Sequence, residues 1–208
     1  IRRWPKRWDK PVENANADLT CSAYENCSAP WGSTHEESLK PLLKNENVSG
    51  MYIWTGFDYI GEPTPYPWPA KSSYFGIVDL AGFPKDAYYL YQSLFTKKSM
   101  LHLFPHWNPG KAGTGWKEGQ MIDMWAYYNN ADEVELFING KSQGIKKKTG
   151  DDMHVMWRVK YEPGSVKAIS RKNGKVVLIK EIKTAGVPAK IILHADRNIL
   201  KSGGDDLS

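Results

Sequence analysis

The pattern of hydrophobic and polar positions divides the chain near residue 98. Beyond that point apolar and polar residues alternate in short runs, and this period of two is typical of strands that bury one face. The segments with this pattern are 101–104, 121–127, 134–138, 144–147, 154–160, 166–170 and 175–182. We therefore expect about seven short strands in the second half of the chain.

Two Asn-Gly dipeptides mark tight turns between these strands. Asn139-Gly140 and Asn173-Gly174 each separate two of the expected strands. Asn-Gly favours a two-residue hairpin because both central residues of a type I′ turn need a positive φ angle. Strands of this number and length, with Trp125 and Trp157 inside them, predict an all-β immunoglobulin-like sandwich over residues 98–186.

The first half of the chain has a different pattern, in which two helices flank one short apolar run. Ser33 or Thr34 is placed to cap a helix that ends near Lys44, with a glutamate positioned to complete a capping box. Apolar residues recur at helical spacing over 85–95. Between these helices we expect a strand over 51–54. The order of helix, strand, long loop and helix is that of one and a half β/α units.

The stretch GMYIWTGFDYIGEP, residues 50–63, is the richest in candidate chemistry. Its apolar run ends at Trp54 and is followed by aromatic, carboxylate, glycine and proline residues. In a parallel β/α barrel the strands are buried, and the binding residues lie on loops that leave their C-terminal ends. This position predicts that Trp54 lies at a site, although a tryptophan packed inside the barrel would show the same pattern.

The sequence resembles glycoside hydrolase family 2, and within it bacterial β-galactosidases. GMYIWTGFDYIGEPTPY and SSYFGIVDLAGFPKDAYYLYQS resemble the last strand and last helix of the family's catalytic barrel. VELFINGKSQG through YEPGSVKAISRKNGKVV resembles the immunoglobulin-like module that follows the barrel. The resemblance implies the C-terminal part of a (β/α)8 TIM barrel over 1–97, the sandwich over 98–186 and the start of a further β-domain over 187–208.

The same resemblance implies a piece of a longer enzyme. A complete barrel takes about 250 residues, more than the 208 of this chain. We expect part of a retaining, β-galactosidase-like glycosidase that hydrolyses terminal β-D-galactosides. The family's two catalytic glutamates lie upstream of the matching stretch, so no catalytic residue and no activity are expected here. Glu46 follows an asparagine, as the family's acid/base does, but it precedes the expected strand and would lie at the wrong end of the barrel.

The resemblance also suggests which residues contact the sugar. Trp54 matches a tryptophan of the family's galactose pocket, and an indole can pack against the C–H face of a sugar. Asp58 could bind sugar hydroxyls or could brace the loop through backbone hydrogen bonds. Trp31 and Tyr74 lie on adjoining loops. Phe75 stands where the family's β-glucuronidases carry a lysine for the sugar carboxylate, so a neutral hexoside such as galactose fits better.

Composition narrows the partners. The net charge of +5 comes from Lys and Arg scattered along the chain, which disfavours nucleic acid because its binding proteins gather basic residues into one patch. No apolar run is long enough to cross a membrane. Dispersed His and only two Cys, Cys21 and Cys27, disfavour a metal site, and we expect no cofactor. The two thiols could form a disulfide or stay reduced.

Two rival functions stay open at this level. An aromatic content of 12% and a sandwich would also suit a non-catalytic carbohydrate-binding module or a structural spacer. A partial barrel would expose apolar faces, which could support a homo-oligomer. The compartment is unknown, with the family resemblance favouring a periplasmic or secreted protein.

Overall fold

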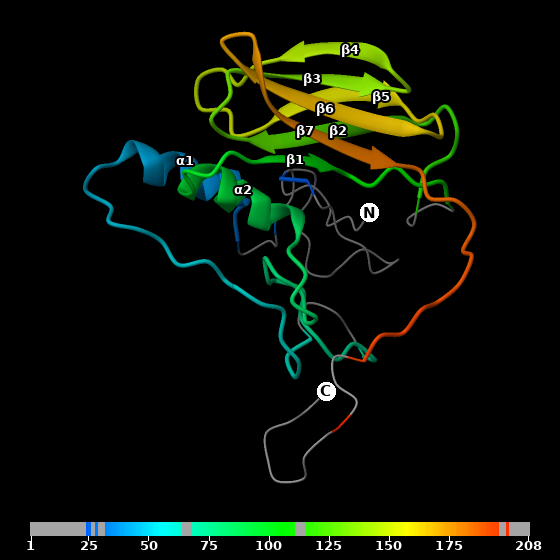
Figure 1. The fold of residues 1–208 in the computed structure, drawn as a ribbon. Helices are drawn as coiled ribbons and strands as arrows, with labels where there is room; N and C mark the ends of the chain where they lie inside the picture. The colour runs from blue at the N-terminus through cyan, green and yellow to red at the C-terminus, as the bar shows by residue number, and fades with distance from the viewer. Residues whose placement is uncertain are drawn as a thin grey trace.

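The computed structural model describes residues 24–25, 28, 32–63, 68–110, 115–195 and 199. Within them the chain forms two helices followed by seven strands in two sheets. The elements are α1 (His35–Lys44), α2 (Asp86–Phe95), β1 (Leu101–Phe104), β2 (Met121–Tyr128), β3 (Glu133–Ile138), β4 (Lys141–Lys146), β5 (Val155–Lys160), β6 (Ser165–Lys172) and β7 (Lys175–Lys183). Figure 1 shows three layers, with the helices on the outer face of one sheet and the other sheet on its inner face.

The strands form a β-sandwich. One sheet has the order β1-β2-β5 and the other has the order β4-β3-β6-β7. All neighbouring strands are antiparallel. Apolar side chains from the inner faces of both sheets meet in one core, which contains Met124 from β2, Leu136 from β3 and Trp157 from β5. The expected β-sandwich is therefore confirmed.

The two Asn-Gly turns set the register of two hairpins. Asn139 and Gly140 have φ angles of 48° and 82°, and Asn173 and Gly174 have φ angles of 50° and 74°. All four are positive, as the expected type I′ geometry requires. β4 nevertheless begins at Lys141, earlier than the sequence pattern indicated. The pattern was misleading because β4 lies at the edge of its sheet and exposes nearly all its side chains, so no alternation marks its start.

The helices pack on the outer face of the three-stranded sheet. Side chains of β2 alternate, so that Met124 faces the sandwich core while Trp125 and Tyr127 face the helices. Leu39 of α1 and Leu90 of α2 are fully buried in this second core. The apolar stripe of each helix therefore has a partner within the same chain.

Both helices lie where the sequence predicts them. Thr34 is the N-cap of α1: its side chain accepts a hydrogen bond from the Glu37 backbone at 3.2 Å, and its backbone N–H donates to the Glu37 carboxylate at 2.9 Å. This is the expected capping box. Neither described helix is long and apolar enough to span a membrane.

The strand expected over residues 51–54 is not formed. The segment has no regular secondary structure, Tyr52 is fully exposed and Trp54 is 74% exposed. A parallel strand needs hydrogen-bonded neighbouring strands; in the described part of the chain no strand lies beside this segment, although Met51 packs against the helices. The assignment of residues 1–97 to the end of a barrel stays a prediction.

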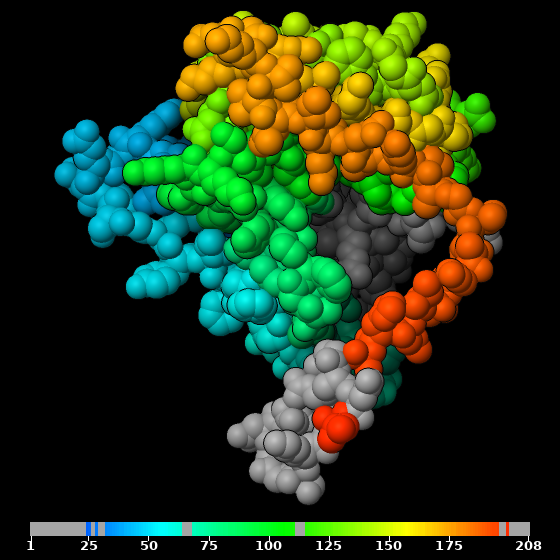
Figure 2. Space-filling model, in the orientation of Figure 1, coloured from blue at the N-terminus to red at the C-terminus, as the bar shows by residue number. Residues whose placement is uncertain are grey.

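Beyond β7 the chain leaves the sandwich. Residues 187–195 have no regular structure and expose Val187, Ile191 and Leu193. Figures 1 and 2 show this orange and red segment projecting away from the two sheets. The start of a further β-domain over 187–208 also stays a prediction.

Candidate functional site

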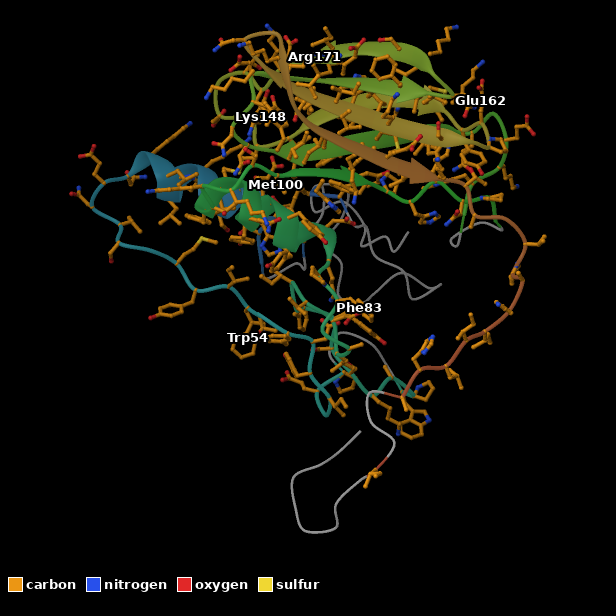
Figure 3. All side chains as sticks on the ribbon, viewed as in Figure 1. Trp54, Phe83, Met100, Lys148, Glu162 and Arg171 are labelled. Carbon is orange, nitrogen blue, oxygen red and sulfur yellow. The ribbon has the colours of Figure 1, made fainter. Side chains whose placement is uncertain are left out.

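The candidate site lies on loops that extend from the helices away from the sandwich. Figure 3 shows Trp54 there, on the segment that follows α1. Its indole Nε1–H donates to the Tyr59 hydroxyl at 3.2 Å. The two rings meet edge to face, with centroids 6.3 Å apart. Tyr59 thus fixes one edge of the indole and leaves most of its surface open.

Backbone hydrogen bonds hold this loop against the segment 71–78. The bonds are Thr55 N–H to Phe75 O (3.2 Å), Ile77 N–H to Thr55 O (3.0 Å), Val78 N–H to Gly56 O (3.0 Å), Asp58 N–H to Val78 O (2.9 Å) and Ser73 N–H to Tyr59 O (3.0 Å). They produce isolated bridges, such as the parallel pair Phe57 and Val78, rather than a sheet. The two segments therefore form one body without regular strands.

Asp58 is the buried polar centre of this body. Its side chain is 2% exposed. Its Oδ1 accepts hydrogen bonds from the Gly76 backbone N–H at 2.8 Å and from the Lys85 Nζ at 2.6 Å. Lys85 also donates to the Tyr74 carbonyl at 3.2 Å. Of the two roles open to Asp58, these contacts describe bracing of the loop; binding of sugar hydroxyls stays a prediction.

Gly76 allows the two segments to approach closely. A Cβ atom at this position would lie 2.1 Å from the backbone nitrogen of Asp58 and 2.5 Å from the carbonyl oxygen of Val78. Both distances are far shorter than van der Waals contact, and both neighbours are backbone atoms that cannot rotate away. Any larger residue would therefore force the Trp54 loop apart from its partner segment.

The other predicted site residues lie at different depths around this loop. Tyr74 is exposed, and its carbonyl accepts from Lys85, the partner of the buried Asp58. Phe75 is half-buried, and its carbonyl belongs to the backbone ladder. Outside the described residues lie Trp31, Cys21 and Cys27.

Sequence reasoning missed Lys85, although the chain contains a signal for it. Lys85 is the N-cap residue of α2 and makes no capping hydrogen bond with its side chain. Ser, Thr, Asp and Asn are the usual caps, and a cation is unfavourable beside the positive end of a helix. A lysine in this position indicates a partner elsewhere, here Asp58. The signal becomes visible only when the first residue of the helix is known, and sequence patterns do not fix helix ends to one residue.

An apolar groove of about 580 Å³ runs beside the helices. Leu39 of α1, Met51 and Phe95 of α2 are among its lining residues. Glu46 also lines it, whereas Trp54 does not. Few polar groups converge here, so the groove suits packing against an apolar element better than sugar binding.

A second polar cluster lies between α1 and the sheet. Glu36 pairs with Nδ1 of His154 at 2.5 Å, and His154 stacks on Trp125 with centroids 3.6 Å apart. Glu25 accepts from the backbone N–H groups of His35 at 2.6 Å and Glu36 at 3.2 Å, and burial raises the pKa of Glu25 to about 7. The Glu36 and His154 pair anchors α1 on the sandwich, while Glu25 accepts from two N–H groups at the start of α1. Among the residues that the structure describes, no three His, Cys, Asp or Glu side chains gather as a metal site would require.

Known proteins match the chain over most of its length. A family model described as a domain of unknown function (DUF4982) matches residues 119–178. Beta-galactosidase BoGH2A of Bacteroides ovatus is 66% identical over 204 residues, which are 98% of this chain and 23% of that protein. The crystal structure of a beta-glycosidase from Bacteroides vulgatus is 38% identical, with a TM-score of 0.75 over 91% of this chain and 23% of that one.

A structure of a glycosyl hydrolase family 2 member from Bacteroides cellulosilyticus is 28% identical, with a TM-score of 0.64 over 78% of this chain and 25% of that one. The chain belongs to glycoside hydrolase family 2. Structures of beta-glucuronidases are among the further matches. The chain spans about a quarter of the length of these family 2 relatives.

Proposed function

We propose that this chain is part of a retaining family 2 glycosidase that hydrolyses terminal β-D-galactosides, and that it supplies one wall of the sugar pocket. Trp54 carries the proposal, because it is an exposed indole, fixed by Tyr59, in a chain 66% identical to a β-galactosidase. In this proposal residues 1–97 are the C-terminal part of the (β/α)8 barrel. Residues 98–186 form an immunoglobulin-like module that supports the barrel, and 187–208 begin a further β-domain.

The indole gives the sugar an apolar surface. A galactose ring presents C–H groups on one face and hydroxyls around its edge, so Trp54 contacts the former while polar groups bond the latter. Tyr74 extends this wall on the adjoining segment, and Trp31 stays a candidate for the same role. Asp58 keeps the loop in place below the wall and is our candidate for a hydroxyl contact if the loop opens toward the sugar.

The two catalytic carboxyl groups of this proposal lie outside the chain. Retention requires a nucleophile and an acid/base about 5–5.5 Å apart, which family 2 provides as two glutamates upstream of the stretch described. Asp58 is ill suited to either role, because its carboxylate is buried against Lys85 and the Gly76 backbone. We therefore expect the chain alone to have no hydrolytic activity.

Phe75 favours a neutral sugar over a glucuronide. A sugar carboxylate at this place would face an aromatic ring in place of a cation. The loss of a hydrogen bond to a charged group costs on the order of 1.5–3 kcal/mol. A glucuronide is the alternative substrate, because beta-glucuronidases are among the structural matches.

The test uses the full-length protein that contains this chain. We expect it to hydrolyse p-nitrophenyl β-D-galactoside with retention, and with a higher kcat/KM than the matching glucuronide. Trp54→Ala should lower kcat/KM by about 10- to 100-fold, because apolar burial of an aromatic side chain contributes about 1.5–3 kcal/mol. Trp54→Phe keeps an aromatic face and should lose less.

Three results would count against the proposal. A higher kcat/KM for the glucuronide would contradict the galactoside as substrate. Equal kcat/KM values for Trp54→Ala and the unmodified enzyme would show that Trp54 does not form a wall of the sugar pocket. Submillimolar binding of galactosides by the chain alone, without hydrolysis by the full-length protein, would favour a carbohydrate-binding module.

A further inference from the structure

We propose that Lys85 is a positioning residue, whose ion pair with Asp58 sets the orientation of the Trp54 wall relative to α2. The inference rests on the proposed function for its catalytic consequence, but its structural part can be tested without activity. The described hydrogen bonds of the Lys85 side chain go to Asp58 and the Tyr74 carbonyl rather than to the indole. Lys85 acts through Asp58 and the backbone of the loop that holds Trp54 and Tyr59.

The first step is that the Lys85 side chain does not stabilise the start of α2. Lys85 occupies the N-cap without capping the helix, in the place where the helix dipole disfavours a cation. Its backbone N–H donates to the Ile77 carbonyl at 2.9 Å. Its Nζ donates to Asp58 at 2.6 Å and to the Tyr74 carbonyl at 3.2 Å. The Lys85 carbonyl accepts from the Tyr88 N–H at 3.0 Å, as an N-cap carbonyl does, but every hydrogen bond that Lys85 is described as donating is directed to the loop body.

The second step is that Asp58 requires this cation. A carboxylate that is 2% exposed has lost nearly all its hydration, and a buried charge is tolerated only when it is paired and hydrogen-bonded. The Gly76 N–H alone would leave the negative charge without a counterion. Lys85 supplies it at charge-assisted hydrogen-bond distance.

The third step connects the ion pair to the indole. Asp58 lies between Trp54 and Tyr59 in the chain, and its backbone N–H is bonded to Val78 O at 2.9 Å. Tyr59 in turn fixes the indole through its hydroxyl. A shift of Asp58 would therefore move the residue that orients the indole.

The fourth step connects the ion pair to the sandwich. Asp86, the residue after Lys85, pairs with Nε2 of His102 in β1 at 2.7 Å. The His102 ring stacks on Tyr89 of α2, with centroids 3.7 Å apart. Two consecutive residues of opposite charge thus reach in opposite directions, Lys85 toward the loop and Asp86 toward the sheet. The start of α2 links the wall to the sandwich.

The test compares variants of the full-length protein by two measurements. Hydroxyl-radical footprinting with mass spectrometry reports the oxidation rate of Trp54 and Tyr59, with the buried Trp157 as internal reference. Hydrolysis of p-nitrophenyl β-D-galactoside reports kcat/KM. Lys85→Met removes the cation, Lys85→Arg retains it, and Lys98→Met removes an exposed lysine beyond α2 as the matched control.

We expect Lys85→Met to change the oxidation rates of Trp54 and Tyr59, to leave Trp157 unchanged and to lower kcat/KM by up to about 100-fold, as a misplacement of about 1 Å can do. Lys85→Arg should restore most of both readouts. The double variant Asp58→Asn, Lys85→Met carries no unpaired buried charge, so it guards against misfolding of the single variant. Its Trp54 rate should still differ from that of the unmodified protein.

Unchanged oxidation of Trp54 in Lys85→Met or in the double variant would overturn the inference, as would an equal change in Lys98→Met.

The outcomes separate this inference from the proposed function. An enzyme that hydrolyses galactosides while Lys85→Met leaves Trp54 unmoved keeps the function and loses the positioning role. A protein inactive on galactosides, in which Lys85→Met still displaces Trp54, loses the function and keeps the positioning role.

Discussion

The sandwich and the Trp54 loop treat their large apolar side chains in opposite ways. In the sandwich, Trp157 and Leu136 are buried between two sheets whose strands bond each other. In the loop, Trp54 and Phe57 are exposed, and the backbone hydrogen bonds of residues 55–61, among the described residues, go to the adjoining segment 71–78. The sandwich thus buries its apolar side chains and pairs its strands within this chain. The loop instead presents an apolar surface to whatever lies beside it. In our proposal that neighbour is the remainder of the barrel and the sugar.

A matched pair of tryptophan substitutions should show the largest difference between the two regions. Trp157 is 3% exposed and donates a hydrogen bond to the Gly144 carbonyl at 2.9 Å, so Trp157→Ala should lower the free energy of unfolding by about 3–5 kcal/mol through the cavity that it leaves. Trp54→Ala removes a side chain that is mostly in water and should change it by less than about 0.5 kcal/mol. Urea denaturation of both variants measures the difference.

The comparison tests how much Trp54 contributes to the stability of the isolated chain. Trp157→Phe serves as the control, because it retains part of the volume and should lose less than Trp157→Ala. A loss for Trp54→Ala comparable to that for Trp157→Ala would contradict the comparison, because it would mean that the indole is packed inside the chain.

The same contrast explains what the sequence could predict. Local signals determined the helices, the hairpins and most strands, because capping boxes and Asn-Gly turns act within a few residues, as at Thr34 and Asn139. β3, β5 and β6 alternate because each buries one face. β4 started earlier than expected because an edge strand need not alternate. The strand expected over 51–54 failed because a parallel strand depends on neighbours that local sequence does not specify.

The candidate site was predictable only in part, for the same physical reason. Trp54 stood out because aromatic, carboxylate and glycine residues follow it directly. Lys85 did not stand out, because its partner Asp58 is 27 positions away and the ion pair exists only after two loops and a helix start have come together. The need for glycine at position 76 could not be predicted, because it depends on the close approach of the Asp58 backbone, which is a tertiary contact.

The helix layer between these two regions should make stability depend on pH. Burial raises the pKa of Glu25 from 4.5 to about 7. Between these values the folded protein binds more protons than the unfolded chain, so the contribution of Glu25 to stability is present at low pH and is lost as the pH rises from about 4.5 to 7. Glu25→Gln keeps an acceptor for the His35 and Glu36 backbones and removes the titration. Its stability relative to the unmodified chain should rise across this window by about 1–3 kcal/mol.

Urea denaturation of both proteins at several pH values between 4.5 and about 7 measures this effect. His35 provides the internal control, because burial lowers its pKa. The folded protein then binds fewer protons at this histidine below its ordinary pKa, so stability should fall with acid in Glu25→Gln. Parallel stability curves for the two proteins would show that Glu25 does not titrate differently on folding.

The smallest expected effect tests where the boundary between the two regions lies. Thr34→Ala removes the side-chain half of the capping box on α1 and should cost about 1 kcal/mol, while Thr34→Ser keeps the hydroxyl and should cost less. Hydrogen exchange of the α1 amides and urea denaturation are measured together.

If α1 belongs to the cooperative unit of the sandwich, both measurements should change by the same free energy, because Leu39 of α1 is buried in the core that β2 shares. Faster exchange in α1 with unchanged global unfolding would instead assign the helix to a separate, less stable unit with the Trp54 loop. No change in either measurement would contradict the role of the capping box itself.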